Sequence, residues 1–318
     1  MSPAMTQIPP NIACLGSLNM DLVIRVPRAP AEGETVQGNS IRYVPGGKGA
    51  NQAVSCARQG ARVSMMGRVG PDHHGEILCE ALKQDGILIR GVTVDPDEST
   101  GVALVMVEEG GLNRIVVISG ANGKLSIDES QLVQELSDAQ FLVMQFEVPM
   151  AQVLQAAKVA RSLGCKVVLN PSPAKPLPEE LWPLVDVMIV NESEARFLTG
   201  LSPDTEPQVA AEVGRRLMAK GVAQVVVTLG ALGAVATDSG GSTYHPAPLV
   251  KVVDTTAAGD TFLGVVTVGL ARDQSLNASV NMGICASTLC IQTMGAQPSI
   301  PTLAQTLQNS SVPSWITI

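Results

Sequence analysis

Aromatic side chains are scarce in this chain of 318 residues, at 3%, with four phenylalanines, two tyrosines and two tryptophans. Single-stranded nucleic acid is commonly held by stacking on aromatic rings, so the composition argues against such a platform and against a tryptophan-lined carbohydrate surface. Positive charge is also short, because 21 Lys and Arg stand against 29 Asp and Glu and leave a formal net charge of −8. A polyanion would be repelled by this charge. We therefore expect no nucleic-acid partner.

Three further features are missing. The six cysteines form no C-x-x-C pair and show no zinc-like spacing with the three histidines. The longest uncharged apolar run, near residues 262–271, is too short to span a bilayer. The first dozen residues lack the basic start and apolar stretch of a signal peptide. We expect buried reduced thiols, no membrane contact and a soluble, cytoplasmic protein.

What the sequence does have is alternation between short β-rich runs and helical patterns. FLVMQFEV at 141–148 precedes a helical pattern from Met150, and DVMIVN at 186–191 precedes one from Glu192. This alternation predicts an α/β fold with a mostly parallel central sheet and helices on both faces. With 45% hydrophobic residues the chain can bury a large core, and its length fits two lobes or one large α/β unit.

Two segments break the alternation, at about 20–43 and 92–118. Both contain strand-like stretches with no helix between them, so the strands must form antiparallel pairs in a small projecting sheet. We predict a large α/β domain of residues 11–19, 44–91 and 119–310, which binds nucleotide and substrate, and a β-sheet lid of residues 20–43 and 92–118.

A glycine-rich stretch, VPGGKGANQA at 44–53, looks at first like a nucleotide-binding loop. A P-loop needs a glycine five residues before its Gly-Lys pair and a Ser or Thr directly after the lysine. Position 42 is Arg42, and Lys48 is followed by Gly49. The stretch therefore needs another explanation.

A second loop, VVDTTAAGDTFLG at 252–264, offers a better anion pocket. A strand leads into small residues and a helix begins at about Gly259, so backbone amides converge at the helix N-terminus without any lysine. Asp260 lies in the first helical turn, where a carboxylate could take a proton from an attacking hydroxyl. It could equally complement the helix dipole, and the motif alone leaves both interpretations open.

Polar residues also lie at predicted strand ends, where open α/β sheets bind ligands. Asn19 and Asp21 follow the first strand, and Glu147 follows a later one. Together with Lys48 and Asn51 they supply the donors and acceptors that a polyol needs. An Asx turn is the alternative for Asn19 and Asp21.

Two more motifs have both a functional and a structural interpretation. In VNESEARFLTG, Asn191 and Glu194 could orient magnesium-bound water or nucleotide phosphate, or they could form a helix capping box. In TLGALGAV, Gly230 and Gly233 could let the backbone approach a nucleotide, or they could serve a tight turn after the strand.

Taken together, the motifs resemble the ribokinase/PfkB-type family of carbohydrate kinases, which also contains fructokinases and adenosine kinase. The resemblance covers about residues 12–301. Eleven motifs occur in the family's order: GSLNMD, GETVQG, GGKGANQA, ESTGVALV, GAN at 120, QFEVP, NPSPA, NESEA, TLGALG, DTTAAGDTF and GAQPSIP. The GGKGAN, N-x-D and GAQPS motifs favour the ribokinase branch. The implied fold is a ribokinase-like three-layer sandwich with a small β-sheet lid.

The resemblance implies ATP-dependent phosphorylation of D-ribose at its 5-hydroxyl, giving D-ribose 5-phosphate and ADP, with Asp260 as the general base. The implied sugar ligands are Asn19, Asp21, Gly47, Lys48, Asn51, Glu147 and Asp260. The implied anion hole is Ala257, Ala258 and Gly259. The implied nucleotide-binding residues are Asn191, Glu194, Thr228, Leu229, Gly230, Ala231, Leu232, Gly233 and Gly259. On this interpretation GGKGAN is the sugar loop.

The implied cofactors are Mg²⁺ with ATP and K⁺ as an activating monovalent cation. The implied cation site, mostly through carbonyl groups, is Asp254, Thr256, Cys290, Thr293, Gly295 and Ser299. The lid's exposed edges predict a homodimer through the lid sheets. The alternatives are a 2-deoxyribose or nucleoside kinase of the same family and a sugar-binding regulator without catalysis. Leu263, Ile284 and Met20 depart from residues common in this family.

Overall fold

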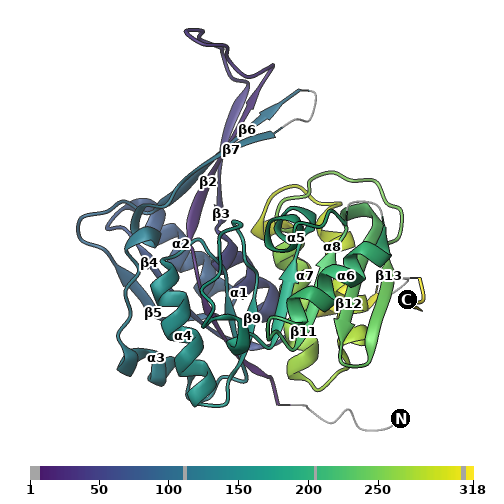
Figure 1. Ribbon diagram of the computed structural model, residues 1–318. Helices are drawn as coiled ribbons and strands as arrows, with labels where there is room; N and C mark the ends of the chain where they lie inside the picture. Colours follow the sequence, from purple (N-terminus) through teal and green to yellow (C-terminus); the bar gives the residue numbers. More distant parts are fainter. Residues whose placement is uncertain (1–7, 110–112, 204–205, 309–312) are drawn as a thin grey trace, which may run out of the picture.

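The computed structural model describes residues 8–109, 113–203, 206–308 and 313–318. These residues form a large α/β body and a small sheet that stands out from it (Figure 1). Within the described residues, every helix is too short or too polar to cross a lipid bilayer.

The central sheet has ten strands in the order β14-β13-β12-β11-β10-β9-β8-β1-β4-β5. Every pairing from β11 to β5 is parallel, and the edge strands β12, β13 and β14 are antiparallel. The predicted mostly parallel sheet is therefore confirmed. The strands are β1 (Asn11–Leu15), β4 (Arg62–Val69), β5 (Leu88–Val94), β8 (Phe141–Met144), β9 (Lys166–Leu169), β10 (Val187–Val190), β11 (Gln224–Thr228), β12 (Gly233–Asp238), β13 (Gly241–Pro246) and β14 (Ile316–Thr317).

Helices cover both faces of this sheet, because each strand's two faces are apolar and need a partner layer. One buried cluster joins the sheet to α3 (Glu129–Leu136), α4 (Met150–Ser162), α5 (Glu192–Thr199) and α6 (Pro207–Met218). The other joins it to α1 (Lys48–Arg58), α2 (His73–Gln84), α7 (Ala258–Ala271) and α8 (Leu276–Cys290). A short helix, α9 (Leu303–Gln308), follows α8. The result is the expected three-layer sandwich.

The small sheet has four strands in the order β3-β2-β6-β7. They are β2 (Asn19–Val26), β3 (Ser40–Gly46), β6 (Gly101–Glu108) and β7 (Asn113–Ile118). The pairs β2–β3 and β6–β7 are antiparallel, as predicted, whereas β2 and β6 pair in parallel. Local patterns cannot show that central pairing, since the chain passes through α1, β4, α2 and β5 between the two strands. Residues 92–94 belong to β5 in the large sheet, and the division into two domains remains a prediction.

One predicted strand is shorter than its sequence pattern indicates. The run at 141–148 forms a strand only to Met144, and the Phe146 amide donates to the Ser172 carbonyl at 2.8 Å. The chain therefore leaves the sheet at Gln145, directly after the last residue of β8. Gln145 and Glu147 are thus outside the strand, where their side chains can reach the candidate site.

Candidate active site

The glycine loop at 44–53 caps helix α1 at the edge of the lid. Gly47 is the N-cap residue, with φ of 90°, and a Cβ there would lie 2.7 Å from the Asn19 amide nitrogen. Only glycine suits such a backbone and such an approach. The Ala50 amide donates to the Ser17 carbonyl at 3.0 Å, so the first turn of α1 is fixed against the segment between β1 and β2.

Asn19 and Asp21 lie two residues apart on β2 and so share one face of the lid sheet. Asp21 packs against Gly46 of β3, where a Cβ would lie 2.3 Å from its Oδ2 atom. The Asn19 Oδ1 atom accepts a hydrogen bond from Asn122 Nδ2 at 2.8 Å. Gly46 and Asn122 therefore restrict the positions of the Asp21 and Asn19 side chains, respectively.

Glu147 reaches the same place from the end of β8. Its Oε2 atom accepts from Ser17 Oγ at 2.5 Å and from the Lys48 backbone amide at 3.3 Å. Together these two bonds hold the carboxylate beside the N-terminus of α1. Glu147 and Asn19 also line a common cavity of about 470 Å³.

The second glycine-containing loop forms the N-terminus of α7, as expected. Ala257 is the N-cap with φ of 61°, an uncommon conformation for a residue with a side chain. A Cβ added to Gly259 would meet no atom within 4 Å, so open space lies directly in front of that backbone. The Ala258 amide instead donates to the Thr255 carbonyl at 3.2 Å.

Asp260 joins this loop to the glycine loop on α1. Its Oδ2 atom accepts from Asn51 Nδ2 at 3.0 Å, and its Oδ1 atom accepts from Gln52 Nε2 at 2.9 Å. The first turns of α1 and α7 therefore meet at the buried carboxylate of Asp260. Asn51 and Asp260 are separated by 209 residues of sequence.

Several carboxylates surround Lys48 at this site. Burial lowers the pKa of Lys48, but the Asp260, Glu147, Glu194 and Asp21 carboxylates outweigh it and raise that pKa overall. Burial, together with Glu147 and Asp260, raises the pKa of Asp21 to about 7, although Lys48 opposes the shift. The Asp21 side chain therefore changes between its protonated and ionised forms near neutral pH.

Asn191 and Glu194 form the capping box at the start of α5. The Asn191 side chain accepts from the Glu194 amide at 2.9 Å, and Glu194 Oε2 accepts from the Asn191 amide at 3.0 Å. Glu194 is buried and also accepts from Asn170 Nδ2 at 3.2 Å. The structural interpretation of this motif therefore holds, and a role toward nucleotide remains a prediction.

The stretch from Thr228 to Gly233 forms a turn between β11 and β12. A Cβ on Gly233 would lie 2.0 Å from the His245 carbonyl, so this glycine serves the pairing of β12 with β13. Leu229 is buried, whereas Gly230, Ala231 and Leu232 lie at the surface. Any nucleotide contact of this turn would come from its exposed tip.

The predicted cation residues lie together behind α7. Asp254 Oδ1 accepts from the Thr256 amide at 3.0 Å, and Asp254 Oδ2 accepts from the Gly295 amide at 2.9 Å. Cys290 Sγ lies 3.0 Å from Ser299 Oγ. Carbonyl and hydroxyl oxygens with one carboxylate suit an alkali cation. Thr293 belongs to the segment that joins the Cys290 and Gly295 ends of this cluster.

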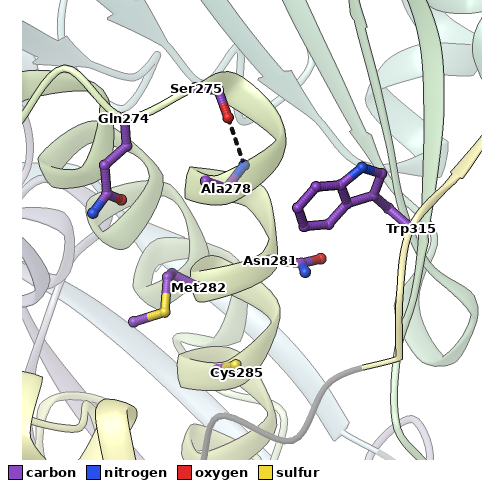
Figure 2. Close-up of a pocket in the computed structure, with 7 residues that line it drawn as sticks. All are labelled: Gln274, Ser275, Ala278, Asn281, Met282, Cys285 and Trp315. Atoms are coloured by element: carbon purple, nitrogen blue, oxygen red, sulfur yellow. Dashed lines mark hydrogen bonds between the residues drawn. The ribbon is translucent and has the colours of Figure 1, made fainter.

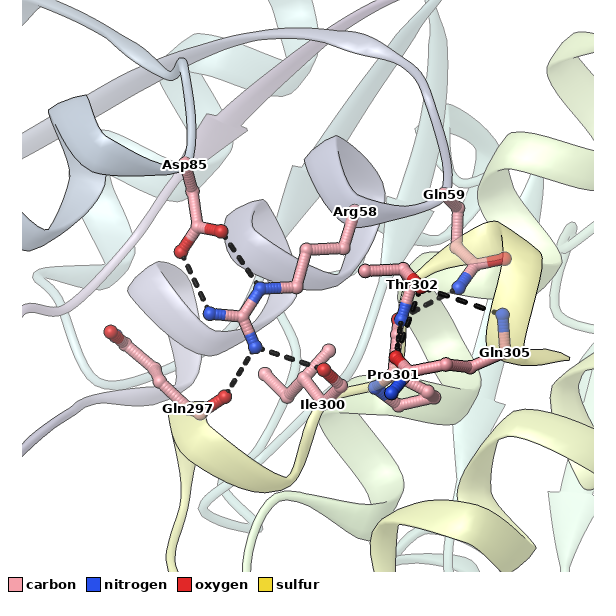
Figure 3. Close-up of polar contacts among 8 residues, drawn as sticks. All are labelled: Arg58, Gln59, Asp85, Gln297, Ile300, Pro301, Thr302 and Gln305. Atoms are coloured by element: carbon pink, nitrogen blue, oxygen red, sulfur yellow. Dashed lines mark hydrogen bonds and ion pairs between the residues drawn. The ribbon is translucent and has the colours of Figure 1, made fainter.

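Arg58 ties the far end of α1 to this region (Figure 3). Its guanidinium makes a bidentate ion pair with Asp85, with 2.8 Å from Nε to Oδ1 and 3.0 Å from Nη2 to Oδ2. Its Nη1 atom donates to the carbonyls of Gln297 and Ile300, at 2.6 and 2.9 Å. The helix that carries the glycine loop is thereby fixed to the segment that follows Gly295.

Cavities lie both at this site and elsewhere on the described surface. A groove of about 860 Å³ between lid and body is lined by Asp21, Thr256 and Gly295, among others. Another cavity, of about 400 Å³, lies between α8 and the C-terminal segment, where Trp315 faces Asn281 (Figure 2). No residue predicted for the site lines that cavity. Among the predicted residues, Asn19, Asp21 and Glu147 line the cavities next to the lid, together with Asp254, Thr256 and Gly295.

A family model described as pfkB family carbohydrate kinase matches residues 9–303. The chain belongs to the pfkB family of carbohydrate kinases. Among curated pfkB-type relatives, it is 39% identical over 302 residues to a ribokinase of Haemophilus influenzae, with 93% of this chain and 97% of that protein covered.

Solved structures of ribokinases share this fold. The chain is similar to Arabidopsis thaliana ribokinase complexed with ribose and ATP, with a TM-score of 0.88, 32% identity, and 96% and 99% of the two chains covered. It is also similar to a Cryptococcus neoformans ribokinase in complex with ADP, with a TM-score of 0.80, 30% identity, and 94% and 99% covered.

Three positions that the sequence analysis singled out, Leu263, Ile284 and Met20, are buried. Leu263 and Ile284 both pack in the cluster that joins α7 and α8 to the sheet. Met20 points away from Asn19 and Asp21, and its side chain lies in the same cluster. These three side chains therefore contribute to packing.

Sequence reasoning missed four polar residues around the predicted ligands. Ser17, Gln52 and Asn122 contact those ligands directly, and Gln145 contacts Gln52. All four lie inside or beside motifs by which this chain resembles the pfkB family. A useful signal was available for Gln145, which lies between the buried apolar residues Met144 and Phe146, but not for Gln52, which directly follows Asn51. Their partners, however, are distant in sequence.

Proposed function

We propose that this protein transfers the γ-phosphoryl group of ATP to the 5-hydroxyl of D-ribose, giving D-ribose 5-phosphate and ADP. One observation carries the proposal: Asn51 of the glycine loop donates directly to Asp260 at the start of α7. A polyol held by the first loop would therefore present a hydroxyl to the carboxylate that borders the predicted phosphate cradle. The names of the relatives support ribose as that polyol.

The residues divide into holding and reacting groups. Asn19, Asp21, Lys48, Asn51 and Glu147 would orient the sugar hydroxyls, together with the backbone at Gly47. Asp260 would accept the proton of the 5-hydroxyl as its oxygen bonds to the γ-phosphorus and the bond from that phosphorus to ADP breaks. The proton remains on Asp260 until it passes to solvent, and ADP leaves with the bonding electrons.

Stabilisation of the migrating phosphoryl group would come from the N-terminus of α7. Open space at Gly259 admits an anion next to the helix start, where the helix dipole is positive. We propose the amides of Ala257 and Gly259 as donors. The Ala258 amide, engaged with Thr255, would shape the turn.

Two cations fit the residues present. Magnesium would arrive on ATP and keep several of its waters, so it needs no protein cage of its own. Bound magnesium would neutralise charge on the phosphates, with Asn191 and Glu194 facing its waters. The loops of Asp254 and Gly295 would hold potassium behind α7.

The lid would close over the sugar and exclude water, because an open site would hydrolyse ATP. Its outer face carries exposed apolar side chains, including Ile41 at 50%, Val116 at 58% and Ile118 at 57% exposed. A second copy of the chain is the occupant that this surface suits, since the same face is available on both. We therefore propose a homodimer through the lid sheets.

An ADP-coupled assay tests the function directly. Turnover would be compared on D-ribose, 2-deoxyribose and adenosine, with and without potassium. We expect ribose to have the highest kcat/KM. A preference for 2-deoxyribose or adenosine would identify that compound, and not ribose, as the substrate. If the protein bound sugar but showed no turnover with any of them, it would be a sugar-binding regulator.

A further inference from the structure

Two glutamines form a buried chain of hydrogen bonds behind Asp260. Gln145, just after β8, donates from Nε2 to Gln52 Oε1 at 2.5 Å. Gln52, on α1, donates from its own Nε2 to Asp260 Oδ1 at 2.9 Å. Both glutamine side chains are fully buried. Neither was among the residues expected to bind sugar, nucleotide or metal.

The direction of this chain is fixed by amide chemistry. A glutamine carries its acceptor and its donors on opposite ends of one group. Because Gln145 occupies the oxygen of Gln52, the nitrogen of Gln52 must face Asp260. If Gln52 turned over, its oxygen would face a carboxylate oxygen, and two acceptors would meet in a buried site at a large energetic cost.

The backbone makes room for this arrangement. A Cβ on Gly16 would lie 2.0 Å from Gln145 Oε1 and 2.8 Å from the Gly49 Cα atom. Any larger residue at position 16 would push Gln145 away from Gln52. The Gln145 Oε1 atom itself is buried without a hydrogen-bond partner. A packing role alone would be met more cheaply by an apolar side chain, because that oxygen loses its hydration.

We propose that Gln52 and Gln145 are positioning residues that orient the Asp260 carboxylate for proton transfer, an inference that rests on the proposed function. Gln52 fixes Oδ1, and Gln145 fixes the direction in which Gln52 donates. The Oδ2 atom, which accepts from Asn51, is then left directed toward the side where the glycine loop would hold the sugar. Gln145 acts on Asp260 only through Gln52.

The test is a kinetic double-mutant cycle with methionine, which keeps the length of glutamine but cannot donate. In Gln52→Met we expect kcat to fall by about ten- to a hundredfold, in line with the cost of misplacing a reacting group. The ribose KM should stay within about threefold, because Gln52 contacts Asp260 from behind. Gln145→Met should lower kcat by less, about three- to tenfold, since Gln52 can still donate for part of the time.

The double variant Gln52→Met/Gln145→Met should have the kcat of Gln52→Met alone. The matched control is Gln59→Met at the C-cap of the same helix. Its buried side-chain amide donates to the Pro301 carbonyl, as drawn in Figure 3, and to the Thr306 hydroxyl. This variant should lower the thermal unfolding temperature without changing kcat or KM. Equal kcat in Gln52→Met and wild type, or multiplicative losses in the double variant, would overturn the proposal.

Failure of the proposed function would be recognised separately. The wild-type protein is assayed first. If it shows no turnover on ribose, the proposed function is contradicted. The hydrogen bonds of the two glutamines are then tested by unfolding experiments, which need no substrate. Thermal unfolding of Gln52→Met, Asp260→Leu and their double variant measures their coupling. We expect the double loss in unfolding temperature to be smaller than the sum of the single losses, and additive losses would overturn the contact itself.

Discussion

The side chain of Asn51 donates a hydrogen bond from Nδ2 to Oδ2 of Asp260, at 3.0 Å, across a sequence separation of 209 residues. The contact links the first turns of two helices, α1 and α7. One begins at the glycine loop beside the lid, and the other begins at the predicted phosphate cradle.

Asp260→Asn removes the proposed base while keeping the size of the side chain. We expect kcat on ribose to fall at least about a hundredfold, the lower end for a lost general base, with sugar affinity within a few-fold of wild type. Coupled kinetics and calorimetric ribose binding measure the two effects. Asp138→Asn, at an exposed position, is the control and should behave as wild type. A D260N variant with near-normal turnover would refute the assignment.

The raised pKa of Asp21 predicts a pH-dependent stability of the ligand-free protein. Burial, with Glu147 and Asp260, raises this pKa to about 7, while the unfolded value is about 3.9. The folded chain thus retains a proton that the unfolded chain has released, so this contribution is fully present below about pH 4 and is lost as pH rises through 7.

Asp21→Asn removes that dependence. Between about pH 5.5 and pH 8.5, wild type should lose roughly 2 kcal/mol relative to D21N. Denaturant unfolding of both proteins across this range measures the difference. Parallel pH profiles for the two proteins would show that Asp21 does not titrate there.

Ser17→Ala removes the hydroxyl that donates to Glu147 at 2.5 Å. A hydrogen bond to a charged group is worth about 1.5–3 kcal/mol, so we expect the ribose KM to rise about tenfold or more and kcat to change less. Ser137→Ala, which alters an exposed serine on α3's C-cap, provides the comparison. An unchanged KM in S17A would mean that Glu147 keeps its position without Ser17.

Arg58→Lys keeps the positive charge but cannot reproduce the four contacts of the guanidinium with Asp85, Gln297 and Ile300. We expect a loss of about 1–3 kcal/mol in stability and a higher potassium concentration for half-maximal activity, because the segment after Gly295 is released. Arg161→Lys, on the surface of α4, is the paired control. An unaltered potassium dependence in R58K would show that the contacts of Arg58 do not support the proposed cation site.

Val116→Lys tests the homodimer. Val116 is 58% exposed on the outer lid face, and a buried lysine there would oppose association of two copies. Light scattering should give a dimer mass for wild type and a monomer mass for V116K. Val133→Lys, at an exposed position on α3, should leave the dimer intact. A wild-type monomer, or a dimeric V116K, would contradict association through this face.

Much of the fold could be predicted because its signals are local. Alternating apolar runs and helix starts predicted the parallel sheet, and the helices expected from Met150, Glu192 and about Gly259 begin within a residue of expectation. The parallel pairing of β2 with β6 was not predicted, since it depends on a crossover through the body rather than on any strand's own pattern.

The candidate site shows the same division. Motifs drew attention to Asn51, Glu147 and Asp260, and the structure places the first and third in contact. The supporting residues Gln52 and Gln145 escaped notice because neither carries a local sign of its partner. Their significance comes from contacts over 93 and 208 residues of sequence.

The most direct test is a crystal structure of the chain with D-ribose and a non-hydrolysable ATP analogue. The account predicts that the 5-hydroxyl lies within about 2.6–3.2 Å of the Asp260 carboxylate, with the terminal phosphate at the Gly259 amide. A terminal phosphate distant from Gly259, or another sugar hydroxyl at Asp260, would contradict it.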